Sequence, residues 1–267
     1  TGSHRFQSYG EIIEGKVVEM KYSEITIRFC GIAGDGIVAS GKILAGACAN
    51  IGLHVMVNNI YSAEIRGLGK SSATIRFSTE KLYSMGDGLD LLVGMMSKES
   101  IIDLRDVKVG GNVIYDTSTI GDVAEEDSLA SHITPEIQGH GLPIKKLANE
   151  ATGTNQGKNL VAIGAICYFY SLPPEMFIDQ IRSVFAHKEE HIIDINIKAF
   201  NLGYEYFREN YPLNNQFEID KRSEPRALTS GNDAIAKGAI DCGLKFFAGY
   251  PITPATKTME IAAKELP

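Results

Sequence analysis

Cysteine is scarce in this chain, and its spacing argues against several kinds of site. The 267 residues include four scattered cysteines and no C-x-x-C pair. Such a pattern favours neither a disulfide framework nor a structural zinc site, and the chain by itself cannot hold a cysteine-ligated iron–sulfur cluster. Cys48 and Cys167 lie in apolar, helix-like surroundings, where cysteine usually acts as a small hydrophobic residue. The six histidines are mostly dispersed, and we assign neither a histidine nor a metal site.

Long apolar runs and an excess of positive charge are also lacking. No apolar run reaches the ~18 residues that a membrane-spanning helix needs. The net charge is −7 and no basic cluster stands out, so we expect no nucleic-acid partner. No signal peptide is recognisable, and we expect a cytoplasmic protein without a membrane partner. With 44% hydrophobic and 22% charged residues, the chain has the composition of an ordinary globular protein of one large or two smaller domains.

The most informative stretch is a glycine-rich turn within residues 24–51. Apolar residues alternate from Ile25 to Phe29, which predicts a strand, and from Ile37 they recur every three or four residues, which predicts a helix. Between the two lie Gly31, Gly34 and Gly36. Strand, turn and helix open a βαβ unit, and the free N–H groups of the turn suit an anion such as a phosphate.

Two interpretations of this turn stay open, namely phosphate contact and close packing of helix on strand. A dinucleotide site also needs an acid about 20 residues further on, at the end of the second strand. The strand predicted at 54–60 ends without one, and Glu64 comes too late. We therefore expect no dinucleotide. The following loop, 61–67 (YSAEIRG), offers Glu64 and Arg66 as either a surface ion pair or ligand-binding residues at the sheet edge.

The remaining pattern predicts an α/β fold with a mostly parallel open sheet and helices on both faces. Further strands are predicted at 72–78, 89–93, 112–116 and 142–147, and helices at 159–171, 175–185, 191–203 and 204–209. Residues 117–141 form a long polar loop, which is typical of a functional or partner-ordered segment. The predicted domains are an extension at 1–22, a first domain at 23–210, a linker at 211–229 and a second domain from 230.

The second domain, 230–267, is predicted to consist of a helix (233–242), a strand (245–250) and a helix (255–266). Three elements cannot make an independent core, so this segment either packs on the first domain or, as we favour, is a fragment of a longer α/β domain. Thr253 precedes Pro254 and is the predicted N-cap of the last helix. Because that N-terminus follows a strand, it also suits a carboxylate or phosphate, and both roles stay open.

Two sets of motifs together resemble the 2-oxoacid:ferredoxin oxidoreductases. The first set resembles their gamma domain and comprises 28–45, 61–67 (YSAEIRG), 142–149 (LPIKKLAN), 159–164 and 195–203. The second, 231–267 with its string FAGYPITP, resembles the opening of their alpha domain, which helps to bind thiamine diphosphate and the 2-oxoacid. Gamma fused in front of alpha is the arrangement of two-subunit members, often 2-oxoglutarate enzymes.

The resemblance implies CoA-dependent oxidative decarboxylation of a 2-oxoacid, with electrons passing to ferredoxin. It implies that Thr253, with Tyr250, Pro251 and Ile252, contacts the substrate, and that CoA or a subunit interface meets the following residues: Gly31, Gly34, Gly36, Glu64 and Arg66. The activating Glu is expected beyond Pro267. Thiamine diphosphate with Mg²⁺ and a [4Fe–4S] cluster are expected mostly on a beta subunit, in a dimer of heterodimers, so this chain alone would not be active.

Two departures from the family pattern bear on these roles. Asp35 follows Gly34 and places an acid beside the supposed phosphate site, and Ala255 replaces a serine that is common after YPITP. Two alternatives therefore remain: a scaffolding domain without a small-molecule site, and, less favoured, a nicotinamide-dependent dehydrogenase.

Overall fold

The computed structural model describes residues 20–32, 36–60, 70–119, 124–213, 215–219, 224–252 and 255–266. These residues belong to two compact units, and the division between them falls after Arg226. Within the described ranges, every helix is too short or too polar to cross a membrane.

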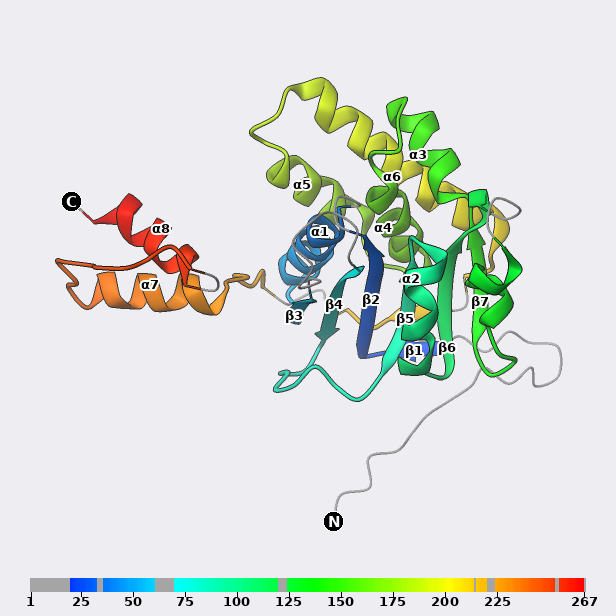
Figure 1. Cartoon of the computed structure of the whole chain (residues 1–267), viewed down its shortest axis with the longest axis horizontal. Coiled ribbons are helices and arrows are strands. Elements are labelled where there is room, and N and C mark those ends of the chain that lie inside the picture. The colour runs from blue at the N-terminus through cyan, green and yellow to red at the C-terminus, as the bar shows by residue number, and fades with distance from the viewer. Residues whose placement is uncertain are drawn as a thin grey trace, which may run out of the picture. The chain divides into compact units, whose positions relative to one another are not determined.

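The first unit is built on a six-stranded sheet in the order β3-β4-β2-β5-β6-β7 (Figure 1). Its strands are β2 (Glu24–Ile32), β3 (His54–Ile60), β4 (Lys70–Ser78), β5 (Leu89–Gly94), β6 (Val107–Asp116) and β7 (Gln138–Leu142). From β2 to β7 the neighbours pair in parallel, whereas β4 is antiparallel to both β2 and β3. The predicted mostly parallel α/β sheet is confirmed, with β4 inserted between the two strands of the predicted βαβ unit.

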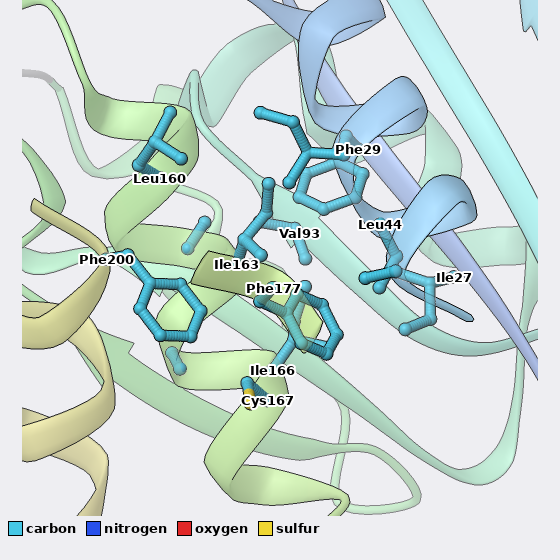
Figure 2. Packing of buried hydrophobic residues seen from close by; sticks show 14 of the residues in the cluster. Ile27, Phe29, Leu44, Val93, Leu160, Ile163, Ile166, Cys167, Phe177 and Phe200 are labelled. Atoms are coloured by element: carbon cyan, nitrogen blue, oxygen red, sulfur yellow. The ribbon is translucent and has the colours of Figure 1, made fainter. Parts of the chain in front are cut away.

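Helices cover both faces of this sheet, as predicted. The larger layer contains α1 (Ile37–Asn50), α3 (Ile144–Thr152), α4 (Lys158–Phe169), α5 (Pro174–Val184) and α6 (Glu190–Asn210). On the other face lie α2 (Ser97–Ile101) and the 3-10 helix Ile102–Asp106. The alternation within β2 explains the two layers, because Ile27 and Phe29 enter the larger core with Leu44 and Ile163 (Figure 2), whereas Cys30 packs in a smaller cluster.

Two glycines let α4 and α6 pack backbone to backbone. A Cβ atom on Gly164 would lie 1.9 Å from the carbonyl oxygen of Phe200, and one on Gly203 would lie 1.9 Å from that of Val161. No side chain fits at such distances. The helix α4 is buried almost all round, as the apolar run from residue 159 predicts.

Three predictions in the first unit are wrong. The long loop predicted at 117–141 ends earlier, because β7 already begins at Gln138. Residues 142–147 do not form a strand, because β7 ends at Leu142 and α3 begins at Ile144. The apolar residues of this segment follow the helical spacing and are buried on one side: Ile144, Leu147, Ala148 and Ala151. The two helices predicted at 191–203 and 204–209 are one continuous helix, α6.

The segments predicted as an extension and a linker meet in a small second sheet. There β1 (Met20–Tyr22) pairs in parallel with β8 (Asn215–Phe217). Further on, the N–H of Arg226 donates to the carbonyl of Ala49 at 2.9 Å, and its Nε donates to the carbonyl of Gly52 at 2.7 Å. The first unit thus holds the chain at the C-terminal end of α1 as far as Arg226.

The second unit contains α7 (Gly231–Asp241) and α8 (Thr256–Glu265). Ser230 and Asp233 form a capping box at the start of α7. The strand predicted at 245–250 is wrong: these residues have no regular structure, since the described part of this unit offers no neighbouring strand to pair with. The predicted N-cap Thr253 is also corrected, because α8 begins at Thr256 with Ala255 as N-cap; Thr253 itself lies outside the described residues.

Candidate site at the carboxyl edge of the sheet

The carboxyl ends of β2 and β5 lie side by side at a point where the chain turns in two directions. From β2 the chain passes through α1 to β3, on one side of this point and over one face of the sheet. From β5 it passes through α2 to β6, on the other side and over the opposite face. In open α/β sheets such a divergence leaves a crevice beyond the strand ends, and ligands bind there. The candidate site is therefore the edge between Ile32 and Gly94.

Two of the predicted glycines lie at this edge. Gly31 is buried near the end of β2, opposite Ser71 of β4. Gly36 is the N-cap of α1 and has a φ of 76°. A Cβ at Gly36 would lie 3.1 Å from the side-chain Cγ and Nδ2 of Asn159, so both backbone and space require glycine there. The third predicted glycine, Gly34, lies outside the described residues.

The N-terminus of α1 lacks a side-chain cap among the described residues, which suits an anion. Gly36 supplies no capping side chain, and the first turn carries no acidic residue. The first N–H groups of a helix have no partner within the helix and carry part of its positive dipole. A phosphate or carboxylate at this position would receive hydrogen bonds from the backbone without needing a cationic side chain.

A cluster of paired charges lies on the opposite face of the same edge. Arg28 Nη1 donates to Asp103 at 3.1 Å and also to Asp106, and Lys70 Nζ lies 2.8 Å from the same oxygen of Asp103. Lys70 pairs in register with Ile32, at the end of β2. Since each cation faces a carboxylate, the cluster joins β2, β4 and the 3-10 helix more than it attracts a ligand. We did not predict it, although an arginine inside an otherwise apolar strand is a usable signal.

A cavity of about 260 Å³ lies beside this cluster rather than at the glycines. Its lining comes from β2, β3, β4 and the segment before β5, with Arg28, Thr26 and Thr74 on the sheet and Asp87 and Asp106 at its rim. Neither Gly31 nor Gly36 contributes to it. The cavity and the open helix end are therefore two separate features of this unit.

The other predicted site residues belong to other parts of the chain. Glu64 and Arg66 lie outside the described residues. Tyr250, Pro251 and Ile252 belong to the second unit and are exposed, Tyr250 by 77%. Their side chains are thus accessible, while the carbonyl of Ile252 accepts hydrogen bonds from the N–H groups of Ala255 and Thr256.

Three of the four cysteines, Cys30, Cys48 and Cys167, are buried, and Cys242 is exposed. Burial raises the thiol pKa of all three buried residues, that of Cys30 to about 12, as for small hydrophobic residues in a core. Among the described residues, no group of three or more His, Cys, Asp or Glu side chains could hold a metal ion.

Asn159 is the residue at this edge that the sequence analysis missed. The sequence predicts it only as the first residue of an apolar helix, yet its side chain lies against Gly36, far away in the sequence. A polar residue at the start of a helix that is otherwise apolar all round is the signal that identifies it.

Comparisons with known proteins agree on one family. The family model for pyruvate ferredoxin/flavodoxin oxidoreductase matches residues 26–206. The ketoisovalerate oxidoreductase subunit VorA of Methanothermobacter marburgensis is 30% identical over 77% of this chain and 41% of its own length. The 2-oxoglutarate oxidoreductase subunit KorA of Mycobacterium tuberculosis is 28% identical over 91% of this chain and 41% of its own. The chain thus spans about two fifths of the length of these relatives.

Shorter relatives match about two thirds of this chain. The 2-oxoglutarate synthase subunit KorC of Archaeoglobus fulgidus is 29% identical over 69% of this chain and 89% of its own length.

Among solved structures, the 2-oxoglutarate:ferredoxin oxidoreductase of Magnetococcus marinus, with 2-oxoglutarate, coenzyme A and succinyl-CoA bound, is 30% identical with a TM-score of 0.80, over 91% of this chain and 41% of its own. The keto/oxoacid ferredoxin oxidoreductase gamma subunit of Geobacter sulfurreducens is 25% identical with a TM-score of 0.54, over 68% and 96%.

Proposed function

Since the chain belongs to the pyruvate ferredoxin/flavodoxin oxidoreductase family, we propose that it works within a 2-oxoacid:ferredoxin oxidoreductase. Residues 23–210 are its gamma-type domain, 211–229 its linker, and 230–267 the start of an alpha-type domain. The reaction is CoA-dependent oxidative decarboxylation of a 2-oxoacid to acyl-CoA and CO2, with electrons passing to ferredoxin. The observation that carries this proposal is the likeness, over 91% of this chain, to the Magnetococcus marinus enzyme.

The proposed substrate is 2-oxoglutarate. KorA and KorC carry that substrate in their names, and the Magnetococcus marinus structure contains it; VorA, named for ketoisovalerate, supports a branched 2-oxoacid as the competing choice. Thr253 orients the substrate carboxylate, aided by its neighbours from Tyr250 to Ile252. The exposure of Tyr250 leaves this segment accessible.

The proposed CoA contact is at the carboxyl edge of the sheet. There Gly31 and Gly36 allow close approach of the ligand to the backbone, and the first turn of α1 donates N–H groups to a phosphate. Gly34, Glu64 and Arg66 complete this surface, or the interface with another subunit.

The redox cofactors are proposed to lie on partner polypeptides. Thiamine diphosphate supplies the decarboxylation chemistry in such an enzyme, and a [4Fe–4S] cluster carries the electrons. Because the four cysteines of this chain are scattered and three of them are buried, we assign the cluster and the Mg²⁺–diphosphate site to a beta subunit. The other proposed partners are the remainder of the alpha domain and ferredoxin, in a dimer of heterodimers within the cytoplasm.

Replacing Thr253 in the complete enzyme tests the substrate role. We expect Thr253→Ala to raise the KM for the 2-oxoacid about tenfold, because a hydrogen bond to a charged group is lost, while the KM for CoA stays unchanged. Thr258→Ala, the same deletion inside α8, is the matched control. An unchanged KM with a lowered melting temperature would leave Thr253 a purely structural role.

A scaffolding role without a small-molecule site is the second candidate. It is favoured by the cavity lying away from the glycines and by the mutual pairing of Arg28, Lys70 and Asp103. Calorimetric titration of the complete enzyme with CoA separates the two roles. Saturable heat that Gly36→Ala abolishes supports the CoA contact, whereas no heat with the wild-type protein supports the scaffold.

A further inference from the structure

Two helices begin at the same place beside the candidate site. The helix α1 has Gly36 as its N-cap, and α4 has Gly157, with φ values of 76° and 87°. Asn159, the second residue of α4, lies with its carboxamide against Gly36: the Cβ position of that glycine is 3.1 Å from Nδ2. The first turns of α1 and α4 are therefore neighbours.

Neither helix has a side-chain cap at its N-terminus. Both N-cap residues are glycines, and neither first turn contains an acidic residue. A side-chain oxygen from Ser, Thr, Asp or Asn normally accepts hydrogen bonds at this position. Here the positive ends of two helix dipoles lie close to each other, with the Asn159 carboxamide beside the start of α1.

The Asn159 side chain points to a ligand at this locality. Asn159 is only 6% exposed, and its carboxamide forms no hydrogen bond with the residues that the structure describes. Burying an amide without a partner costs free energy, so buried asparagines are normally hydrogen-bonded. An amide beside two open helix N-termini gains a partner when an acceptor, above all an anion, binds there.

We propose that Asn159 is an oxyanion-binding residue, which donates from Nδ2 to a phosphate group held by the first-turn N–H groups of α1, beside the start of α4. This extends the CoA contact proposed for Gly31 and Gly36, and it rests on that function only for the identity of the natural ligand. The requirement for glycine at position 36 follows as well, since any side chain there would displace the Asn159 carboxamide.

Inorganic phosphate tests the site without any enzymatic activity. In ¹⁵N spectra of the full chain titrated with phosphate, the amide signals of residues 37–39 and 158–159 should shift together and saturate. Chloride at the same ionic strength serves as the reference for screening. Signals that respond equally to both salts would overturn the proposal, and this measurement needs no variant.

Two substitutions that keep the branching of the side chain sharpen the test. Asn159→Leu should weaken phosphate binding about tenfold, because it removes one hydrogen bond to a charged group. Asn159→Asp should weaken it further, because it adds a like charge. Asn201→Asp is the control, since Asn201 is exposed on α6 and acquires the same charge away from the site. Full affinity in both Asn159 variants would overturn the proposal.

Competition with CoA distinguishes this inference from the proposed function. Phosphate binding that depends on Asn159 and is displaced by CoA supports both. The same binding without displacement supports the oxyanion site and argues against the CoA contact. If the wild-type enzyme and the Asn159→Leu enzyme bind CoA equally well, the proposed role of Asn159 is contradicted, whereas the proposed CoA contact is not.

Discussion

The two units place their large apolar side chains in opposite environments. In the first unit, Phe177, Phe200 and Phe207 are fully buried. In the second, the buried hydrophobic residues among those described are Ala236 and Ala262, whereas Phe246 is 79% exposed and Tyr250 77%. Both units contain phenylalanine side chains, so the difference lies in whether neighbouring elements cover them.

This contrast shows which unit has a core of its own. Burying a large side chain contributes about 1.5–3 kcal/mol, and the first unit does so across two packed layers on one sheet. In the described pair α7 and α8 the buried hydrophobic side chains are those of Ala236 and Ala262. They bury little area and cannot offset the conformational entropy of the unit, Ala227–Pro267. An apolar surface of this extent is typical of an interaction site, which accords with the proposed remainder of the alpha domain as its partner.

The largest expected difference between the two units comes from truncating one phenylalanine side chain to alanine in each. Phe200→Ala should lower the free energy of unfolding of the chain by about 3–5 kcal/mol, as a large cavity forms beside Phe177. Phe246→Ala should change it by less than about 0.5 kcal/mol. Urea denaturation followed by circular dichroism measures both. Equal effects would remove the distinction between a packed unit and an unpacked one.

Glycine-to-alanine substitutions should have opposite signs in the two units. Gly164→Ala places a methyl group on the backbone of α6 and should cost about 3 kcal/mol. Gly238→Ala in α7 meets nothing within 4 Å and should stabilise that helix by about 0.5–1 kcal/mol. Thermal unfolding measures the first, and the helical circular dichroism signal measures the second. A tolerated Gly164→Ala would contradict the close crossing of α4 and α6.

A pH effect is expected from the first unit, through His140. Burial lowers the pKa of this histidine to about 4, and its Nε2 lies 2.9 Å from Asn112 Oδ1. The unfolded chain takes up the proton below about pH 6.5, so stability is full above that pH and falls towards pH 4. Between pH 7 and pH 5 the loss should be about 2 kcal/mol.

His140→Gln, which keeps a donor for Asn112, is the variant that tests this origin. Its unfolding free energy should fall less than that of the wild type between pH 7 and pH 5. Because the second unit contains no histidine, parallel losses in both proteins would assign the pH dependence to other groups.

The smallest expected effect concerns the junction between the units. Arg226→Ala removes the Nε hydrogen bond to Gly52 at the C-terminal end of α1 and should cost about 1 kcal/mol or less. Hydrogen exchange at the amide of residue 226 should become faster, while the amides inside α1 keep their protection. Arg105→Ala is the control, because Arg105 is also exposed and makes only a 3.9 Å ion pair. Unchanged exchange at residue 226 would mean that the side chain does not hold the junction.

Periodicity alone predicted the elements whose faces differ clearly in polarity. The alternation of β2 and the three-to-four spacing of α1 are local patterns, and the structure confirms both. Residues 142–147 were mispredicted because a short apolar run fits either period, and burial against the α4–α6 pair selects the helix. The strand predicted at 245–250 is wrong for a related reason. A strand is stable only when a neighbouring strand pairs with it, and the local spacing of residues does not reveal whether one is present.

The candidate site was only half predictable. Gly31 and Gly36 were found because a strand, a glycine-rich turn and a helix adjoin in sequence. Asn159 was not, because nothing local places the start of α4 beside the start of α1. The cluster around Asp103 was missed for the same reason, as its partners Arg28 and Lys70 come from two different strands.

The sequence by itself determined the α/β class, the glycine-rich turn and the apolar faces, because these follow from spacing along the chain. The tertiary structure decided that β4 separates β2 from β3, that Gly164 and Gly203 bring α4 and α6 into backbone contact, and that Asn159 meets Gly36. The physical reason is that these contacts join segments far apart in sequence, and their energies arise only when the whole core packs.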